Sequence, residues 1–170
     1  MKLTTPLRTA LAAATLFGLS APAMAQDEWP TPEETAAAFK AICLDHPGDH
    51  KAQAKAATTA PWNLKKGKDA DAQRTYYDDG TWQVGLSTSD GGLKVCSLTT
   101  AASGEMTDAK ARTAAIEVLG PRPADIEPEE GGFYWTPTIE GRDYMIMFQA
   151  KTFDNDGDPR TMVSYGLAWK

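Results

Sequence analysis

The sequence lacks an apolar run long enough to cross a membrane as a helix. Its leading apolar run, Leu11 to Leu19, is shorter than the roughly 18 residues that a span requires. Lys2 and Arg8 precede this run, and Ala23-Met24-Ala25 follows it. A short apolar core between basic residues and a small-residue cleavage site is typical of a secretory signal peptide. We therefore expect cleavage near Ala25 and a periplasmic or secreted protein with no membrane span.

Positive charge is scarce in the expected mature chain, residues 26–170. These 145 residues are enough for one domain. Without Lys2 and Arg8, 15 basic residues remain against 23 acidic ones, a net charge of −8. An acidic domain repels phosphate backbones and anionic lipid surfaces. The composition therefore excludes nucleic acid and membrane surfaces as expected partners.

Cysteine is scarce as well, since the chain has only Cys43 and Cys96. In an exported protein, two cysteines favour one disulfide because the compartment is oxidising. The alternative is a reactive thiol, which needs a free thiolate that such a compartment seldom leaves. A bond between two positions this far apart stabilises the fold by about 4 kcal/mol in the chain-entropy description. We expect the Cys43–Cys96 disulfide.

The central stretch from Arg74 to Thr100 predicts a β-hairpin. Two β-prone runs flank a loop of Ser, Asp and paired Gly. In the first run Trp82, Val84 and Leu86 alternate with polar or small residues, as in a half-buried strand. Cys96 lies on the returning run, so the expected disulfide would join this hairpin to the first helix.

Helix signals precede and follow this hairpin. Thr31-Pro32-Glu33-Glu34 is a capping box with proline at the first helical position, and the helix should end before Pro47. Asp49 predicts the start of a second helix, through about Thr59. A third is expected from about Thr107 to Leu119, where Gly120-Pro121 follows.

Three further strands are expected near the C-terminus, and their pattern completes the fold prediction. They are predicted at about 133–136, 144–152 and 161–169. Runs of strands, rather than alternating strands and helices, indicate an α+β fold. We expect a mainly antiparallel sheet of about five strands, a hairpin plus a three-strand meander, with about three helices. The segments 65–73 and 122–132 are expected to be loops.

The acidic segment Asp154-Asn155-Asp156-Gly157-Asp158 is a candidate cation site. Alternating carboxylates on a tight bend suit Ca²⁺, so Asp154, Asp156 and Asp158 are candidate metal ligands. The match to an EF-hand loop is poor, because the glycine comes early and the twelfth position is not glutamate. The alternative interpretation is a polar hairpin turn.

Catalytic motifs are missing. The two histidines, His46 and His50, flank a Pro-Gly pair that breaks the helix on which such a spacing would bind metal. There is no Gly-x-Ser-x-Gly sequence to supply a nucleophile. Acidic residues such as Glu129 and Glu140 leave a hydrolase as the alternative, but a glycosidase needs two carboxyl groups at a defined separation.

Aromatic residues lie on or beside the predicted strands, and Tyr77, Trp82 and Trp135 are the candidate binding face. Projecting from one face, they would form a surface for a protein or a sugar. The alternative is that they fill the core, because strands favour aromatic residues. The sequence thus predicts an exported, non-enzymatic binding module of the bacterial envelope, with an envelope protein or a cell-wall component as its partner. No cofactor is expected beyond the candidate Ca²⁺; a cation-stabilised module and a hydrolase remain the alternatives.

Overall fold

The computed structural model of the chain describes residues 29–68, 73–103, 106–155 and 157–170. The expected signal peptide lies outside these residues. Across the described ranges, no helix is both long and apolar enough to cross a membrane.

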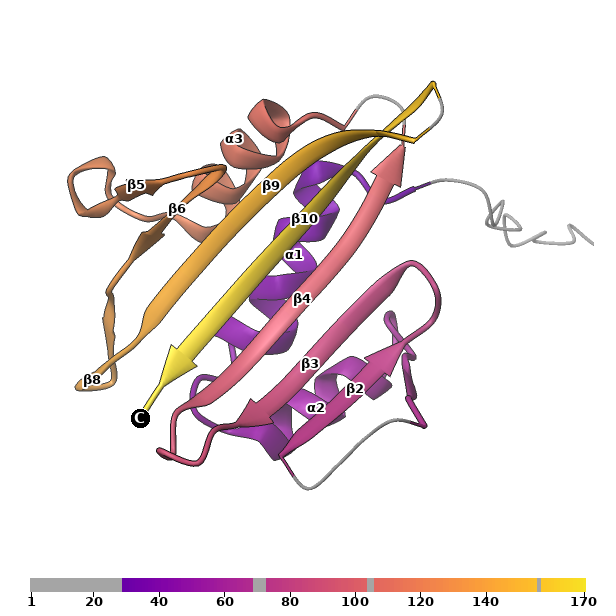
Figure 1. Ribbon diagram of the computed structural model, residues 1–170. Coiled ribbons are helices and arrows are strands. Elements are labelled where there is room, and N and C mark those ends of the chain that lie inside the picture. Colours follow the sequence, from indigo (N-terminus) through magenta and orange to yellow (C-terminus); the bar gives the residue numbers. More distant parts are fainter. Residues whose placement is uncertain (1–28, 69–72, 104–105, 156) are drawn as a thin grey trace, which may run out of the picture.

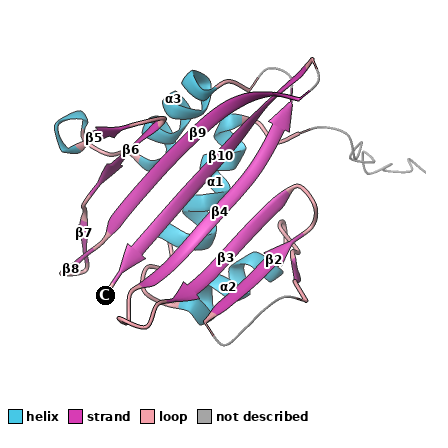
Figure 2. Ribbon diagram, in the orientation of Figure 1, coloured by secondary structure: helices cyan, strands magenta, loops and turns pink. Residues whose placement is uncertain are grey.

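The fold is α+β and is built on an antiparallel sheet of eight strands, in the order β1-β2-β3-β4-β10-β9-β6-β5 (Figures 1 and 2). A separate two-stranded hairpin contains β7 and β8. The strands are β1 Lys65–Lys66, β2 Arg74–Asp78, β3 Trp82–Thr88, β4 Lys94–Ser103, β5 Glu127–Glu129, β6 Gly132–Trp135, β7 Thr138–Ile139, β8 Arg142–Asp143, β9 Met145–Asn155 and β10 Asp158–Trp169.

The α+β prediction is confirmed, but the predicted sheet of about five strands was too small. Three strands were not counted. The first run of the predicted hairpin folds as two strands, β2 and β3, with a turn at 79–81 between them. The two edge strands, β1 and β5, lie in the segments 65–73 and 122–132 that were expected to be loops. They have only two and three residues, too few to show a period-two pattern. Both are strands because a longer neighbour supplies the hydrogen-bonding partners.

The three α-helices are confirmed close to their predicted ends. They are α1 Pro32–Phe39, α2 His50–Thr58 and α3 Asp108–Leu119, with short helical turns at η1 Lys40–Leu44 and η2 Pro123–Asp125. Thr31 and Glu34 form the expected capping box, and Asp49 and Thr107 cap α2 and α3. Gly120 ends α3 in the left-handed conformation that glycine tolerates (φ 67°).

All three α-helices pack on one face of the sheet, behind it in Figure 1. Burial along β9 alternates accordingly. Ile146 and Phe148 are buried on the helix side, and Met145 and Met147 are exposed on the other side. The alternation of the sequence puts these two pairs on opposite sides of β9, and the structure shows that Ile146 and Phe148 are the pair that meets the helices. We call the side without helices the open face.

The predicted disulfide is present between Cys43 and Cys96, both fully buried. Cys43 lies on η1, a π-helical extension of α1, and Cys96 lies on β4. Buried Gln53 joins α2 to the same region, because its side-chain amide donates hydrogen bonds to the carbonyls of Cys43 (3.2 Å) and His46 (3.0 Å). A disulfide of this kind indicates an oxidising, extracytoplasmic compartment.

Candidate functional site

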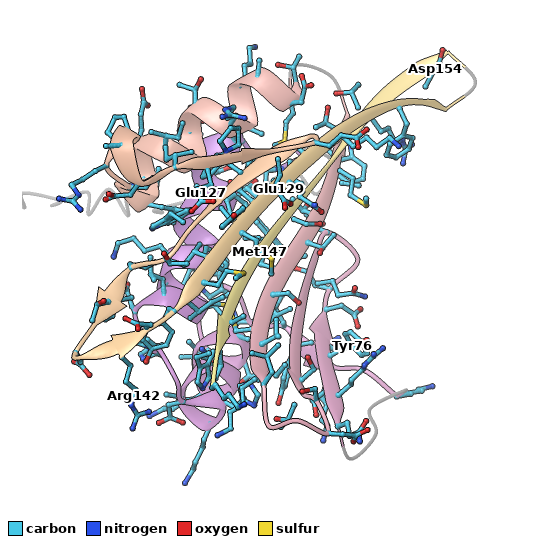
Figure 3. All side chains as sticks on the ribbon, turned by 60° about the vertical axis from the view of Figure 1, so that its left-hand side comes forward. Tyr76, Glu127, Glu129, Arg142, Met147 and Asp154 are labelled. Atoms are coloured by element: carbon cyan, nitrogen blue, oxygen red, sulfur yellow. A yellow bond between two sulfur atoms is a disulfide. The ribbon has the colours of Figure 1, made fainter. Side chains whose placement is uncertain are left out.

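The open face is an ordered surface whose rows can be read from the strand register. One row crosses seven strands and takes one residue from each, every residue being the cross-strand partner of the next. It runs through Tyr76, Gly85, Ser97, Gly166, Met147, Tyr134 and Glu127. Figure 3 labels both ends of this row and Met147 between them. The open face therefore has small residues on its central strands and larger ones on either side.

Large apolar side chains gather on one part of this face. We call Met145, Met147, Phe153 and Met162 the methionine patch. They are 41, 38, 40 and 43% exposed, and they lie on the neighbouring strands β9 and β10. Four of the six large hydrophobic side chains exposed among the described residues thus share one surface. By register they form two pairs: Met145 and Met147 follow one another on one side of β9, and Phe153 lies diagonally opposite Met162, with Gln149 and Ser164 between the pairs. Single exposed apolar residues are ordinary, whereas several on one surface indicate an interaction site.

Two glycines let larger side chains lie flat across the centre of the open face. A Cβ on Gly166 would come within 3.1 Å of the terminal methyl carbon of Met147. A Cβ on Gly85 would lie 2.8 Å from the hydroxyl oxygen of Ser97 and 3.5 Å from the ring of Tyr76. The surface between Tyr76 and Met147 is consequently low and has only a small cavity of about 150 Å³ beside Ser97.

The charge of the open face differs from that of the molecule as a whole. By register, its described charged side chains are four basic and three acidic: Lys65, Arg74, Lys151, Arg160, Asp78, Glu127 and Glu129. At the β5 edge the hydroxyl of Tyr134 donates to the carboxylate of Glu127, and this bond raises the pKa of Tyr134. The face is nearly neutral, although the expected mature chain has a net charge of −8.

The three aromatic residues proposed from the sequence as a binding face lie on the helix side of the sheet. Tyr77 is half-buried opposite Val84. Trp82 packs edge-on against Trp62, with ring centroids 5.6 Å apart, and Trp135 is only 5% exposed. They pack against or within the core instead of forming one exposed surface.

The methionine patch was not singled out from the sequence, although its signal was present. Met145 and Met147 alternate with apolar residues whose period already assigns those neighbours to the core. If one side of β9 faces the helices, the methionines must face outward. What the sequence could not show is that the open face has no helix of its own.

The candidate cation site lies at the tip of the β9–β10 hairpin, where Figure 3 labels Asp154. The Asp154 carboxylate accepts a hydrogen bond from the backbone N–H of Gly157 at 2.7 Å, so it holds the turn. Asp156 lies outside the described residues, and so does the side chain of Asp158. Within the part of the chain that the structure describes, no three His, Cys, Asp or Glu side chains come together as a metal site.

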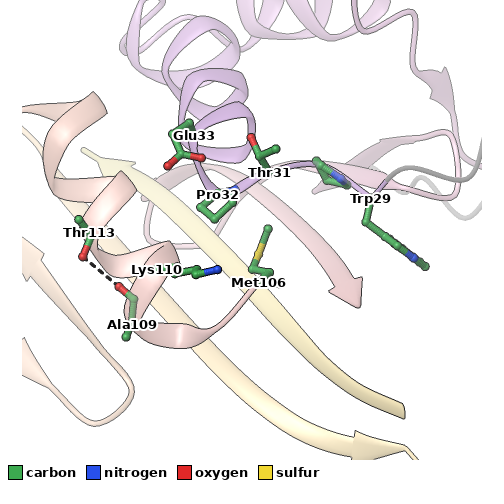
Figure 4. Close-up of a pocket in the computed structure, with 9 residues that line it drawn as sticks. Trp29, Thr31, Pro32, Glu33, Met106, Ala109, Lys110 and Thr113 are labelled. Carbon is green, nitrogen blue, oxygen red and sulfur yellow. Dashed lines mark hydrogen bonds between the residues drawn. The ribbon is translucent and has the colours of Figure 1, made fainter. Parts of the chain in front are cut away.

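A cavity of about 600 Å³ lies between the start of α1 and α3 (Figure 4). Buried Pro30 and Met106 line it together with Trp29 and residues of both helices. Glu33 is the only carboxylate among the described lining residues, and Lys110 is the only cation. A two-carboxylate hydrolase needs a second acidic group here. The described lining residues do not offer that pair.

His50 is in a setting that favours its neutral form. Its ring lies edge-on to Trp169 with centroids 5.0 Å apart, and its Nε2 atom is buried without a hydrogen-bond partner. Burial lowers the pKa of His50, and the hydrogen bond to the Val95 backbone opposes that shift. The ring sits beside a small polar cavity that has no serine or carboxylate among its described lining residues, so it lacks the partners of a catalytic triad.

Comparison with known proteins adds no name to this arrangement: no family model matches the chain, and no curated protein or solved structure matches it either.

Proposed function

We propose that this chain is an exported, non-enzymatic binding module that docks another exported protein on its open face, with the methionine patch as the centre of the contact. The observation that carries the proposal is the grouping of Met145, Met147, Phe153 and Met162 on one side of two adjacent strands. No helix covers them (Figure 1).

The chemistry of the patch favours a protein over a saccharide. Methionine side chains are flexible and polarisable, and they adapt to the irregular apolar surface of a partner protein. Stacking on a sugar ring instead calls for flat, exposed aromatic faces, and Phe153 is the only aromatic member of the patch. The exposed tryptophan, Trp29, already has the guanidinium of Arg160 over its ring at 5.6 Å.

The distribution of charge also favours the open face as the docking surface. Two acidic proteins repel each other over most of their surfaces, and the repulsion is weakest where basic and acidic groups balance. The open face has that balance. The partner that fits is therefore an exported protein with an apolar contact surface, whose own net charge can be acidic.

The two edges of the sheet are less suitable for docking than the open face. At one edge β1 has two residues, both lysine, and at the other β5 has Pro128 at its centre. Short edge strands, lysine and proline all oppose the addition of a further strand. A partner that docks by extending the sheet is thus disfavoured.

The test is capture from an envelope extract with the oxidised protein from Gln26 onward. A variant with Met147→Glu and Met162→Glu should capture its partner at least roughly tenfold less, because a charge at an apolar contact must be desolvated. Leu93→Glu is the matched control, since Leu93 is 43% exposed but lies in the β3–β4 turn. It should capture as the wild type does.

Three results would contradict the proposal. One is equal capture by the wild type and the Met147→Glu, Met162→Glu variant. Another is capture of wall fragments in place of a protein. The third is a concentration-dependent dimer in light scattering that the same two substitutions abolish, which would make a second copy of the chain the occupant.

A further inference from the structure

We infer that Met145, Met147 and Met162 are a site of reversible oxidation, at which a hydroperoxide converts the thioethers to sulfoxides and weakens docking on the open face. The inference rests on the proposed function, because it concerns the regulation of that same surface.

The distribution of sulfur in the chain supports this site. Both cysteines are in the disulfide, so no thiol competes for an oxidant. From Gln26 onward the sequence has four methionines. Met106 lines the cavity between α1 and α3 and is only 6% exposed, whereas the other three are 38–43% exposed. Oxidation of sulfur follows exposure, and here the exposed thioethers all belong to one surface.

The reaction is a two-electron oxygen transfer. The O–O bond of the hydroperoxide breaks and one oxygen forms an S–O bond with the thioether. The other oxygen takes the hydroperoxide hydrogen and leaves as an alcohol, or as water when the oxidant is hydrogen peroxide. Sulfur is oxidised and the peroxide is reduced. In the reverse direction a methionine sulfoxide reductase supplies two thiols, which form a disulfide and release the oxygen as water.

Oxidation at these positions changes the surface without entering the core. By register the three side chains lie on the side of the sheet without helices, and each is partly exposed to water. A sulfoxide is polar, and three of the four members of the methionine patch would carry one. The centre of the docking surface is then costly to desolvate, while the packing under the helices is unchanged.

The experiment treats the oxidised-disulfide protein with hydrogen peroxide and follows each methionine by peptide mass spectrometry. Met145, Met147 and Met162 should each gain one oxygen well before Met106. The melting temperature should stay close to that of untreated protein. Capture of the partner should fall about tenfold and should return after treatment with methionine sulfoxide reductases.

Two triple variants distinguish an effect of side-chain polarity on binding from oxidative damage to the fold. Substitution of all three residues by leucine keeps an apolar patch that peroxide cannot oxidise, so its capture should be the same before and after treatment. Substitution of all three by glutamine imitates the polar product, and its capture should already be weak without peroxide.

Distinct results overturn the two proposals. Oxidation of Met106 as fast as the other three would overturn the selective site. Unchanged capture after full oxidation, while Met147→Glu with Met162→Glu abolishes capture, would overturn the switch and leave the docking surface standing. If neither peroxide nor those glutamates change capture, the docking surface is wrong and the switch falls with it.

Discussion

The hydroxyl of Tyr165 is a polar group that destabilises an otherwise well-packed part of the core. The ring of Tyr165 stacks on Phe39 with centroids 5.1 Å apart, and the side chain is almost fully buried on β10. The hydroxyl has no hydrogen-bond partner, and burial raises the pKa of the group. A buried donor without a partner keeps its full desolvation cost.

We therefore expect Tyr165→Phe to stabilise the protein by about 1 kcal/mol, because it removes the unpaired hydroxyl and leaves the ring. Urea unfolding of both proteins measures the difference. Tyr134→Phe is the matched control: its hydroxyl is on the surface and has the Glu127 carboxylate as its partner, so no gain in stability is expected. A loss of stability in Tyr165→Phe would show that the hydroxyl has a partner in solution.

Residue-level prediction from the sequence succeeded where a strand alternates and failed where two aromatic residues are adjacent. In β9 the spacing puts Phe148 and Met147 on opposite sides of the strand, and the structure has Phe148 buried and Met147 exposed. For Tyr76 and Tyr77 the spacing shows only that they face opposite ways. Which of the two meets the helices depends on how β2 pairs with β3, and this pairing is a property of the assembled sheet.

At the level of single elements, helix caps were the features that the sequence predicted most directly. The capping box at Thr31, the Asp49 cap and the glycine stop at Gly120 are all local, and all three were found from the sequence. The π-helical turn at Lys40–Leu44 was not predicted. Ile42 and Cys43 are buried in this turn, and Cys43 forms the disulfide there.

Gly132 on β6 is the element-level position at which a side chain has no room. A Cβ there would lie 1.9 Å from the carbonyl oxygen of Phe148 on the paired strand β9. Since backbone atoms cannot move aside as a flexible side chain can, Gly132→Ala must separate β6 from β9. We expect a loss of about 3 kcal/mol in the free energy of unfolding.

The control for Gly132→Ala is Gly91→Ala in the β3–β4 turn. Its nearest heavy atom would be the Ser89 hydroxyl oxygen at 3.8 Å, an ordinary contact. That substitution should change stability by less than about 0.5 kcal/mol. Equal effects of the two changes in denaturant titrations would contradict the close approach of β6 and β9.

At the level of the whole molecule, the disulfide joins the helical layer to the sheet. It closes a loop between positions 53 residues apart. The chain-entropy description then gives about 4 kcal/mol of stabilisation, mainly by restricting the unfolded chain. Cys43→Ala with Cys96→Ala should lose about this amount in guanidinium unfolding. Two reactive thiols in the wild type, unfolded without reductant, would refute the bond.

The position of β10 makes one strand responsible for the continuity of the sheet. β10 lies between β4 and β9, so within the described residues the strands on its two sides have no other hydrogen-bonded connection in the sheet. Without residues 158–169 the sheet would be two separate pieces, β1 to β4 and β5, β6 and β9, each with an unpaired inner edge. Such edges are templates for pairing with another chain, so β10 also protects the molecule against edge-to-edge aggregation.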